Sequence, residues 1–478
     1  MKNLLQETIV APATTPGTGA ISIVRVSGPD AFRTVDAVVS LKSGTVSEAE
    51  GYTIHFGSVI LSDSEGSLLD EVLVSVFRAP HSYTGEDAVE ISTHASAYIV
   101  EELVRLLLAA GARLAEPGEF TRRAFLNGKM DLAQAEAVAD VIAASNAAAH
   151  RVAMTQLKGG YSRELEALRS QLLEMASLLE LELDFSEEEV EFAQRDQLLD
   201  LVRKTRAHVE KLAGSFRQGN MIRNGVPVAI VGAVNAGKSS LLNALLGEDR
   251  AIVSEVAGTT RDTVEELLQV EGVAFRFIDT AGMRESEDRI ERLGIERSYR
   301  KMEEAAVVLG VLDSSNTLSE FQVNLQHICG HIDPANQHLI LVLNKIDLLS
   351  EYDINNFVTM GNVFVSSAGI HSIILPVSAK TLDGLDLLKK ALSRTQKDLL
   401  TADSATLVTN LRHYHSLTAC AASLTRTEEA LKSALPTDLV AEDLRAAVGS
   451  VNLILGHDLG LSPEAVLHNI FSHHCIGK

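Results

Sequence analysis

The sequence predicts a multidomain protein with an α+β domain at the N-terminus, a helical domain, and a doubly wound α/β domain inserted into the helical domain. Three observations lead to this prediction. The chain has 478 residues, which is enough for roughly three domains of about 150 residues each. Its apolar pattern changes from short alternating runs to helical stripes, and then to strand-like runs separated by helical segments. Helical patterns return afterwards, so the two helical parts are expected to form one domain.

The N-terminal part is predicted to mix strands and helices. Residues 20–26 and 71–77 alternate apolar and polar side chains, and residues 98–110 follow with a helical pattern. From residue 117 the pattern becomes helical. One long helix is indicated by apolar residues that step by three and four positions, namely Leu165, Leu168, Leu172, Met175 and Leu179. Seven of the twelve residues from 180 to 191 are acidic, which predicts a solvated face or loop.

The α/β part follows the first helical segment. Strand-like runs occur at 228–231, 275–278, 306–312, 339–343 and 373–375, with helical segments between them. From residue 408 to 478 the chain is again expected to be helical. The predicted boundaries are therefore 1–118, 119–220, 221–400 and 401–478, of which the second and fourth segments are halves of the helical domain.

The amino-acid composition excludes several classes of protein. Hydrophobic residues make up 46% and charged residues 22% of the chain, as in an ordinary folded protein. The net charge of −22 excludes a uniformly basic nucleic-acid coat, although not a local basic groove. Three scattered cysteines, Cys329, Cys420 and Cys475, fit neither a disulfide scaffold nor a zinc site. With no signal-peptide pattern and no apolar run of about 18 residues, we expect a soluble, cytoplasmic protein.

The most specific motif is a phosphate-binding loop. Residues 232–239 read GAVNAGKS, which matches GxxxxGK[ST] between a predicted strand and an apolar helix. Glycines let backbone amides surround phosphate oxygens, and the helix N-terminus adds positive potential. Lys238 is expected to reach the β and γ phosphates, and the Ser239 hydroxyl to bind Mg²⁺.

Further motifs follow in the order that a GTPase requires. Thr260 is a candidate second Mg²⁺ ligand, and residues 279–282 (DTAG) would bring a carboxylate near the metal. In residues 344–347 (NKID), Asp347 can accept two hydrogen bonds from guanine that adenine cannot supply. Residues 378–380 (SAK) offer a backbone amide to the guanine O6. The residues predicted to bind GTP are Asn235, Ala236, Gly237, Lys238, Ser239, Ser240, Ser254, Glu255, Val256, Ala257, Gly258, Thr259, Thr260, Asp279, Thr280, Ala281, Gly282, Asn344, Lys345, Asp347, Ser378, Ala379 and Lys380.

One element of a Ras-like site is missing. Met283 stands where Ras-like enzymes carry the glutamine that positions water, and a methionine cannot orient water. No arginine finger is evident from the sequence, so catalysis must recruit another group. The charged segment 284–292 could supply one, from Glu285, Glu287, Asp288 or Glu291.

Three signatures make the whole chain resemble the MnmE (TrmE) family of tRNA modification GTPases. They are TIVA at 8–11 before GAI at 19–21, PGEFTRRAFLNGK at 117–129 continued by DLAQAEA at 131–137, and CIGK at 475–478. The resemblance implies an N-terminal folate-binding-like domain that mediates dimerisation, a helical domain, and a Ras-like P-loop GTPase domain inserted into it.

The resemblance also implies a specific activity. With the flavoprotein MnmG (GidA), in a heterotetramer, such a homodimer adds an aminomethyl or carboxymethylaminomethyl group to carbon 5 of the wobble uridine of certain tRNAs. The one-carbon unit comes from 5-formyl- or methylene-tetrahydrofolate, and no membrane takes part. Matching positions for the folate contacts are Arg25, Glu90, Lys129 and Lys478, and Cys475 provides a thiol in the tail.

By the same resemblance, K⁺ supports GTP hydrolysis. Its matching ligands are Asn235, Ser254, the Val256 carbonyl and Thr259, and Glu291 matches the residue that positions water. Mg²⁺ would be held by Ser239 and Thr260. The chain departs from the family at His94-Ala95-Ser96, where His-Gly-Gly is usual, and at His474, where phenylalanine is usual.

Two other functions are compatible with a GTP site. A ribosome-assembly GTPase of the Era or Der type would need an RNA-binding appendage, and no GxxG clamp in a basic setting follows the α/β part. A regulatory switch would bind guanine nucleotides but hydrolyse GTP slowly without a partner protein.

Overall fold

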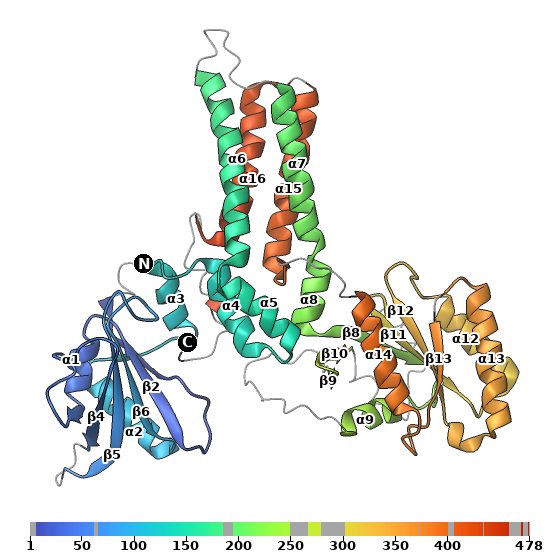
Figure 1. Cartoon of the computed structure of the whole chain (residues 1–478), viewed down its shortest axis with the longest axis horizontal. Coiled ribbons are helices and arrows are strands. Elements are labelled where there is room, and N and C mark those ends of the chain that lie inside the picture. The colour runs from blue at the N-terminus through green and yellow to red at the C-terminus, as the bar shows by residue number, and fades with distance from the viewer. Residues whose placement is uncertain are drawn as a thin grey trace. The chain divides into compact units, whose positions relative to one another are not determined.

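The structure is a computed structural model that describes residues 6–61, 66–184, 195–248, 266–278, 302–370, 372–399, 406–433, 435–457, 470–471 and 477. The chain divides into two compact units (Figure 1). One comprises Met1–Ile142, Ala153–Val209 and Ser416–Lys478, and the other comprises Ala143–Val152 and Glu210–His415.

The first unit contains a seven-stranded sheet of order β3-β4-β5-β6-β2-β1-β7. Its strands are β1 (Ile9–Pro12), β2 (Ile21–Ser27), β3 (Val39–Leu41), β4 (Thr53–Ile60), β5 (Leu68–Phe77), β6 (Ala88–His94) and β7 (Arg113–Leu114). Strand β7 pairs parallel with β1, and the other described pairs are antiparallel. The alternating patterns predicted at 20–26 and 71–77 are confirmed as β2 and β5.

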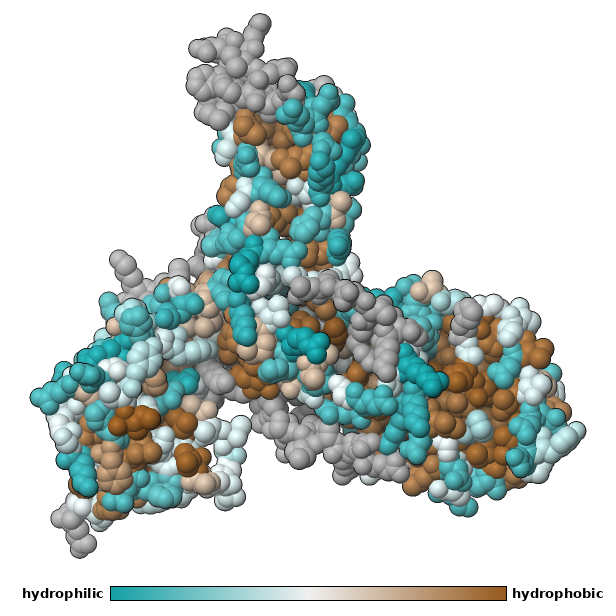
Figure 2. Space-filling model, viewed as in Figure 1, coloured by the Kyte–Doolittle hydropathy of each residue, from teal (hydrophilic) through white to brown (hydrophobic). Residues whose placement is uncertain are grey.

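One face of this sheet carries the core of the domain. Helices α1 (Ala31–Asp36) and α2 (Ala97–Ala109) cover it, and Val24, Val74 and Leu103 are fully buried there. The other face leaves apolar side chains exposed, among them Ile54, Phe56 and Leu73. Figure 2 shows hydrophobic side chains gathered over the strands of this sheet. A half-covered sheet with apolar residues on its open face is typical of a surface that binds a partner.

At His94-Ala95-Ser96, where the family resembled usually has His-Gly-Gly, the backbone conformation does not require glycine. Neither Ala95 nor Ser96 has a positive φ, and Ser96 precedes α2 with φ −99° and ψ 129°. Residues with side chains therefore fit this turn without backbone strain.

Further helices lie between the two sheets along the chain and after the second sheet, and the first unit contains most of them. Four long helices lie side by side in Figure 1: α6 (Gly160–Asp184), α7 (Arg195–Gly214), α15 (Leu411–Lys432) and α16 (Thr437–Leu455). Shorter helices are α3 (Glu119–Leu126), α4 (Leu132–Ala143), α5 (Ala147–Leu157) and α8 (Phe216–Asn224). The predicted stripe from Leu165 to Leu179 is buried along α6.

Bonds between helices tie the two ends of the chain together. Arg169 of α6 donates to Asn452 of α16, and Arg203 of α7 pairs with Glu428 of α15 at 2.8 Å. Lys432 and Arg203 lower the pKa of Glu428 to about 2 through hydrogen bonds. Helices from before and after the α/β segment thus share one bundle, which confirms the predicted insertion. Helix α6 continues through Asp184, so the first part of the acidic run is helical.

The second unit contains a six-stranded sheet of order β13-β12-β11-β8-β10-β9. Its strands are β8 (Val226–Gly232), β9 (Glu266–Val270), β10 (Val273–Phe277), β11 (Val307–Asp313), β12 (His338–Asn344) and β13 (Ser372–Pro376). All described pairs are parallel except β9 with β10. The five predicted strands are confirmed. Strand β9 was not predicted; it is an edge strand that hairpins into β10.

Helices cover both faces of this sheet, as predicted. They are α9 (Lys238–Glu248), α12 (Leu318–Cys329), α13 (Glu351–Ser367) and α14 (Leu385–Leu399). Alternate residues of β8 enter two different cores: Val228 and Ile230 contribute to one, and Ala229 and Val231 to the other. The sheet is therefore doubly wound. Among the described helices, none combines the length and apolar character needed to cross a lipid bilayer.

Candidate functional site

The polar motifs of the second unit meet at one edge of its sheet. The phosphate-loop motif follows β8, Asp313 ends β11, the NKID motif follows from the end of β12, and Ser378 comes shortly after β13. In a parallel sheet the carboxyl ends of neighbouring strands lie together, and ligands bind there. The topology thus brings together segments more than a hundred residues apart.

The loop after β8 has the backbone geometry of a phosphate site. Asn235 and Gly237 have φ values of 61° and 90°. A Cβ on Gly237 would lie 2.2 Å from Nδ2 of Asn344, so only glycine fits this position. Successive amides in such a loop, followed by the N-terminus of α9, form a concave donor set suited to phosphate oxygens.

Lys238 lies across this loop. Its Nζ donates to the carbonyl oxygens of Gly232 at 2.9 Å and Ala233 at 2.8 Å. Burial lowers the pKa of Lys238. These two hydrogen bonds hold the ammonium group beside the loop, where a bound phosphate would accept hydrogen bonds from it in place of the carbonyl oxygens.

Asn344 joins three segments of the site. This buried side chain donates from Nδ2 to the Ala236 carbonyl at 2.9 Å and accepts from the Ala379 amide at 3.1 Å. The phosphate loop and the SAK segment are therefore held at a set spacing by one amide group.

Asp347 lies in a 3₁₀ turn and is oriented by Ser378. The Ser378 hydroxyl donates to Oδ1 of Asp347 at 2.7 Å and accepts from the Thr381 amide at 3.1 Å. The hydroxyl thus gives its single proton to the carboxylate and uses a lone pair for the amide. A carboxylate held in this way can accept paired N–H groups from a base edge.

Asp313 was not predicted as a residue of this site. This carboxylate is 7% exposed and lies 2.6 Å from Nζ of Lys345, and it also accepts from the amide and hydroxyl of Ser315. Burial alone would favour the neutral acid, but hydrogen bonds from Lys345 and Ser315 lower the pKa of Asp313. Its position at the end of the next parallel strand was the signal that could have identified it.

Several predicted site residues lie outside the described residues. They are Ser254, Glu255, Val256, Ala257, Gly258, Thr259, Thr260, Asp279, Thr280, Ala281, Gly282, Glu291, Cys475 and Lys478. Within the part of the chain that the structure describes, no group of three or more His, Cys, Asp or Glu could hold a metal ion. Of the residues predicted to hold an ion, the structure describes Asn235 and Ser239, whose amide and hydroxyl oxygens are donors of the type that hard cations prefer.

A pocket lies in the first unit, beside the sheet. It is lined by Arg25, Phe77, Tyr83, Thr84, Ala88 and Glu90. Arg25 and Glu90 are cross-strand partners on β2 and β6, and Nε and Nη2 of the guanidinium donate to Oε1 of the carboxylate at 3.0 and 2.8 Å. The guanidinium also lies 5.4 Å from the ring of Tyr83. Two of the predicted folate contacts are therefore neighbours in one pocket.

The other predicted contacts lie differently. Lys129 does not line the pocket; its Nζ donates to the Pro80 carbonyl at 2.9 Å. From the tail, the described residue Gly477 accepts from Nη1 of Arg25 at 3.2 Å. Gly477 has φ 98°, and a Cβ there would lie 2.1 Å from the Pro12 carbonyl oxygen. Gly477 therefore lies against the guanidinium of the pocket.

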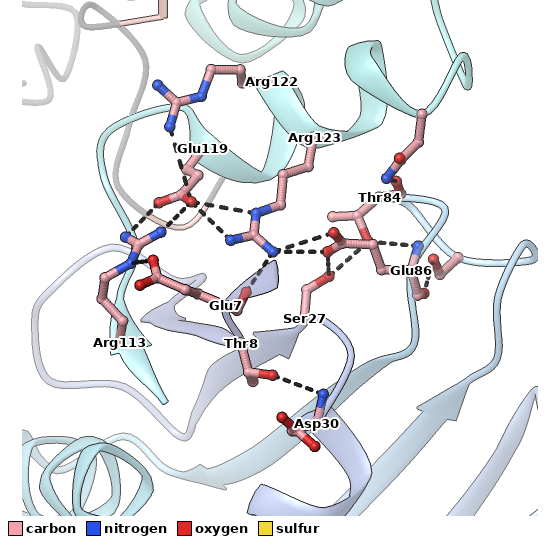
Figure 3. A network of polar contacts seen from close by, with 12 residues as sticks. Glu7, Thr8, Ser27, Asp30, Thr84, Glu86, Arg113, Glu119, Arg122 and Arg123 are labelled. Carbon is pink, nitrogen blue, oxygen red and sulfur yellow. Dashed lines mark hydrogen bonds and ion pairs between the residues drawn. The ribbon is translucent and has the colours of Figure 1, made fainter. Parts of the chain in front are cut away.

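A buried charge network lies beside this pocket (Figure 3). Glu119 is fully buried and accepts from Arg113 and Arg123. Burial opposes its charge, but bonds from Arg113, the Glu116 amide and Arg123 hold the pKa of Glu119 below its usual value. The same pairing with Glu119 raises the pKa of Arg113. None of these residues was predicted to have a role, because their spacing follows no apolar period.

Comparison with known proteins agrees with this architecture. Residues 132–475 match the family model described as the MnmE helical domain, and residues 8–129 match the one described as the GTP-binding protein TrmE N-terminus. The tRNA modification GTPase MnmE of Bacteroides fragilis (strain YCH46) is 46% identical over 477 residues, which cover 99% of this chain and 100% of that one. The protein of the same name from Christiangramia forsetii is 47% identical over 481 residues, with coverage of 99% and 100%. That from Flavobacterium johnsoniae is 44% identical over 477 residues and 99% of each chain.

Proposed function

The chain belongs to the MnmE family of tRNA modification GTPases, and on that basis we propose the chemistry, cofactors and partners through which it acts. With the flavoprotein MnmG, in a heterotetramer, it adds an aminomethyl or carboxymethylaminomethyl group to carbon 5 of the wobble uridine of certain tRNAs. A 5-formyl- or methylene-tetrahydrofolate supplies the one-carbon unit. The reaction takes place in the cytoplasm.

The observation that carries this proposal is the pocket of the first unit. Its Glu90 carboxylate can accept paired N–H groups from an amino-pyrimidine edge, and Phe77 and Tyr83 offer apolar ring surface to a flat heterocycle. Arg25 can donate to a carbonyl or carboxylate of the same ligand. Reduced folates combine these features in one molecule.

Nucleoside analysis tests the reaction. Transfer RNA from a strain that lacks the chain should lose the modified wobble uridine, and the reintroduced chain should restore it. A ribosome-assembly GTPase of the Era or Der type would instead leave the nucleoside profile unchanged and alter ribosomal subunit profiles.

For the nucleotide, we propose that Lys238, Ser239, Asn344, Asp347 and the other predicted residues bind GTP. The two hydrogen bonds of Asn344 support this assignment, because they join the loop that would bind the phosphates to the segment that would bind the base. Ser239 and Thr260 would hold Mg²⁺, which neutralises charge on the β and γ phosphates when bound. Glu291 is proposed to position the attacking water.

We also propose that K⁺ assists hydrolysis, held by Asn235, Ser254, the Val256 carbonyl and Thr259. When bound, K⁺ supplies the positive charge that an arginine finger supplies in other GTPases. The exposed Asn235, with its left-handed backbone, presents an amide oxygen of the type that such an ion prefers.

Replacing Asn235 with alanine should therefore remove most of the stimulation by K⁺. We expect the unchanged chain to turn over GTP about 100-fold faster in KCl than in NaCl at matched ionic strength, the contribution of a charge-stabilising group in a transition state. The control is Asn356→Ala, an exposed asparagine on α13. Equal turnover in the two salts would contradict the K⁺ assignment.

A homodimer is proposed through the open face of the N-terminal sheet. Phe56 and Leu73 are directly opposed on β4 and β5 and remain 44% and 49% exposed. An apolar face of this kind is suited to a second copy of itself.

The double variant Phe56→Glu/Leu73→Glu should convert the dimer to monomers, because two carboxylates would be buried in the interface. Sedimentation velocity measures the change as a halving of mass. Leu108→Glu, on the exposed side of α2, is the matched control and should remain dimeric. A dimer that survives the double change would show that the interface lies elsewhere.

For the domain boundaries, we propose the four segments 1–118, 119–220, 221–400 and 401–478. The shared bundle of α6, α7, α15 and α16 supports joining the second and fourth segments into one helical domain.

A further inference from the structure

The signature segment 117–129 contributes more to the pocket than the one contact proposed for Lys129. Within it, helix α3 is buried at six consecutive positions from Glu119 to Ala124, including Glu119, Arg122 and Arg123. Buried ion pairs rarely add stability, because apolar residues of similar volume often serve as well or better. The charged residues of α3 therefore indicate that this helix has to hold its neighbouring residues in a defined geometry.

Arg123 connects α3 to two other segments. Its Nε and Nη2 donate to Oε1 of Glu119 at 3.3 and 3.0 Å, and its Nη1 donates to the carboxylate of Glu86 at 3.1 and 3.2 Å (Figure 3). The same Nη1 donates to the Glu7 carbonyl at 2.8 Å. With 1% exposure, Arg123 has no competing contact with solvent.

Glu86 connects Arg123 to the wall of the pocket through hydrogen bonds. It lies in the segment between β5 and β6, and its Oε2 accepts from the Ser27 hydroxyl at 2.9 Å. Ser27 and Thr84 are joined by a hydroxyl–hydroxyl bond of 2.7 Å, and the Glu86 amide donates to the Thr84 hydroxyl at 3.2 Å. Thr84 lines the pocket, so only two contacts separate Arg123 from the ligand-facing wall.

The signature segment holds the same wall at further points. Thr121 and Tyr83 share a hydroxyl bond of 2.8 Å, and Nδ2 of Asn127 donates to the Thr84 carbonyl at 2.7 Å. On the other side, the ring of Phe120 lies 5.5 Å from the guanidinium of Arg25. Residues on different sides of α3 and in the turn after it thus contact residues of one pocket.

We infer that the signature segment is a clamp for this pocket, in which Thr121 holds Tyr83, and that Arg123 and Glu86 are positioning residues which fix Thr84 without touching the ligand. This inference rests on the proposed binding of a reduced folate and deepens it. An apolar α3 could support the fold, but it could not orient the wall segment through directed bonds.

The test uses the full chain and 5-formyltetrahydrofolate as the probe, with affinity measured by titration calorimetry. Glu86→Gln keeps the size of the side chain and removes its charge. Arg123→Lys keeps the charge and loses the planar guanidinium with its several directed N–H donors. Each should raise the Kd about tenfold, as expected when one bond to a charged group is lost. The control is Glu102→Gln, which breaks the ion pair with Arg105 on α2 and should leave the Kd unchanged.

A second readout separates positioning from folding. In the modification assay, the KM for the folate should rise while kcat at saturating folate and the rate of GTP hydrolysis stay the same. A fall in thermal stability accompanied by equal losses of kcat and GTP hydrolysis would overturn the inference. So would an unchanged Kd in both variants while the unchanged chain binds the probe. Absence of binding in the unchanged chain would overturn the proposed function and this inference with it.

Discussion

Replacing Asp347 with asparagine should change the preferred nucleotide from GTP to XTP. The carboxylate can accept from both N1–H and the 2-amino group of guanine, whereas an amide matches the N1–H and the 2-oxo group of xanthine. Such hydrogen-bonded sites reject the wrong partner strongly, so kcat/KM for GTP should fall about 1,000-fold or more. Steady-state hydrolysis of both nucleotides by the two chains measures the change.

Ser378→Ala provides the matched comparison. It removes the hydroxyl that donates to Asp347 at 2.7 Å and leaves the carboxylate in place. We expect about a tenfold loss of kcat/KM for GTP, with no gain for XTP. An Asp347→Asn chain that still prefers GTP over XTP would contradict the assignment of Asp347 to the base.

Removing residues 475–478 should abolish tRNA modification and leave GTP hydrolysis nearly intact. In the described tail, Gly477 accepts from Arg25, which itself pairs with Glu90 in the pocket. We propose that Lys478 pairs with the glutamate part of the folate and that the Cys475 thiol takes part in the same function. Loss of a group that orients a reacting cofactor costs about 100-fold or more. Nucleoside analysis of tRNA and a parallel GTPase assay measure the two activities.

Point variants separate the contributions of the tail. Gly477→Ala should impair modification on its own, because its Cβ would lie 2.1 Å from the Pro12 carbonyl oxygen in a left-handed backbone. Cys475→Ser distinguishes thiol chemistry from packing. Full modification by the truncated chain would mean that the tail is dispensable.

Much of the architecture could be predicted because it depends on local patterns. The strict order of strand, glycine-rich loop and helix at 226–248 predicts a phosphate site from neighbouring residues alone, and the loop has that geometry. The stripe from Leu165 to Leu179 predicted α6, because a period of 3.6 residues marks one buried face. In contrast, β9 was missed because a short edge strand carries little apolar signal of its own.

Other features depend on contacts between distant residues. Asp313 and Lys345 are paired because β11 and β12 are parallel neighbours, a fact that no motif around either residue contains. Arg25 and Glu90 were predicted as folate contacts only by resemblance, and their direct pairing follows from the register of β2 and β6.

By itself, the sequence determined the fold class, the phosphate loop, the ordered nucleotide motifs and the family. These depend on residue types at short spacings, and short spacings set backbone conformation directly. Only the tertiary structure decided that Glu119 and Arg123 are buried together, that Glu86 connects them to the pocket, and that Gly477 reaches Arg25. Burial and pairing of charges depend on which surfaces meet after folding, and a charged side chain in a sequence looks the same whether solvent or another charge will be its neighbour.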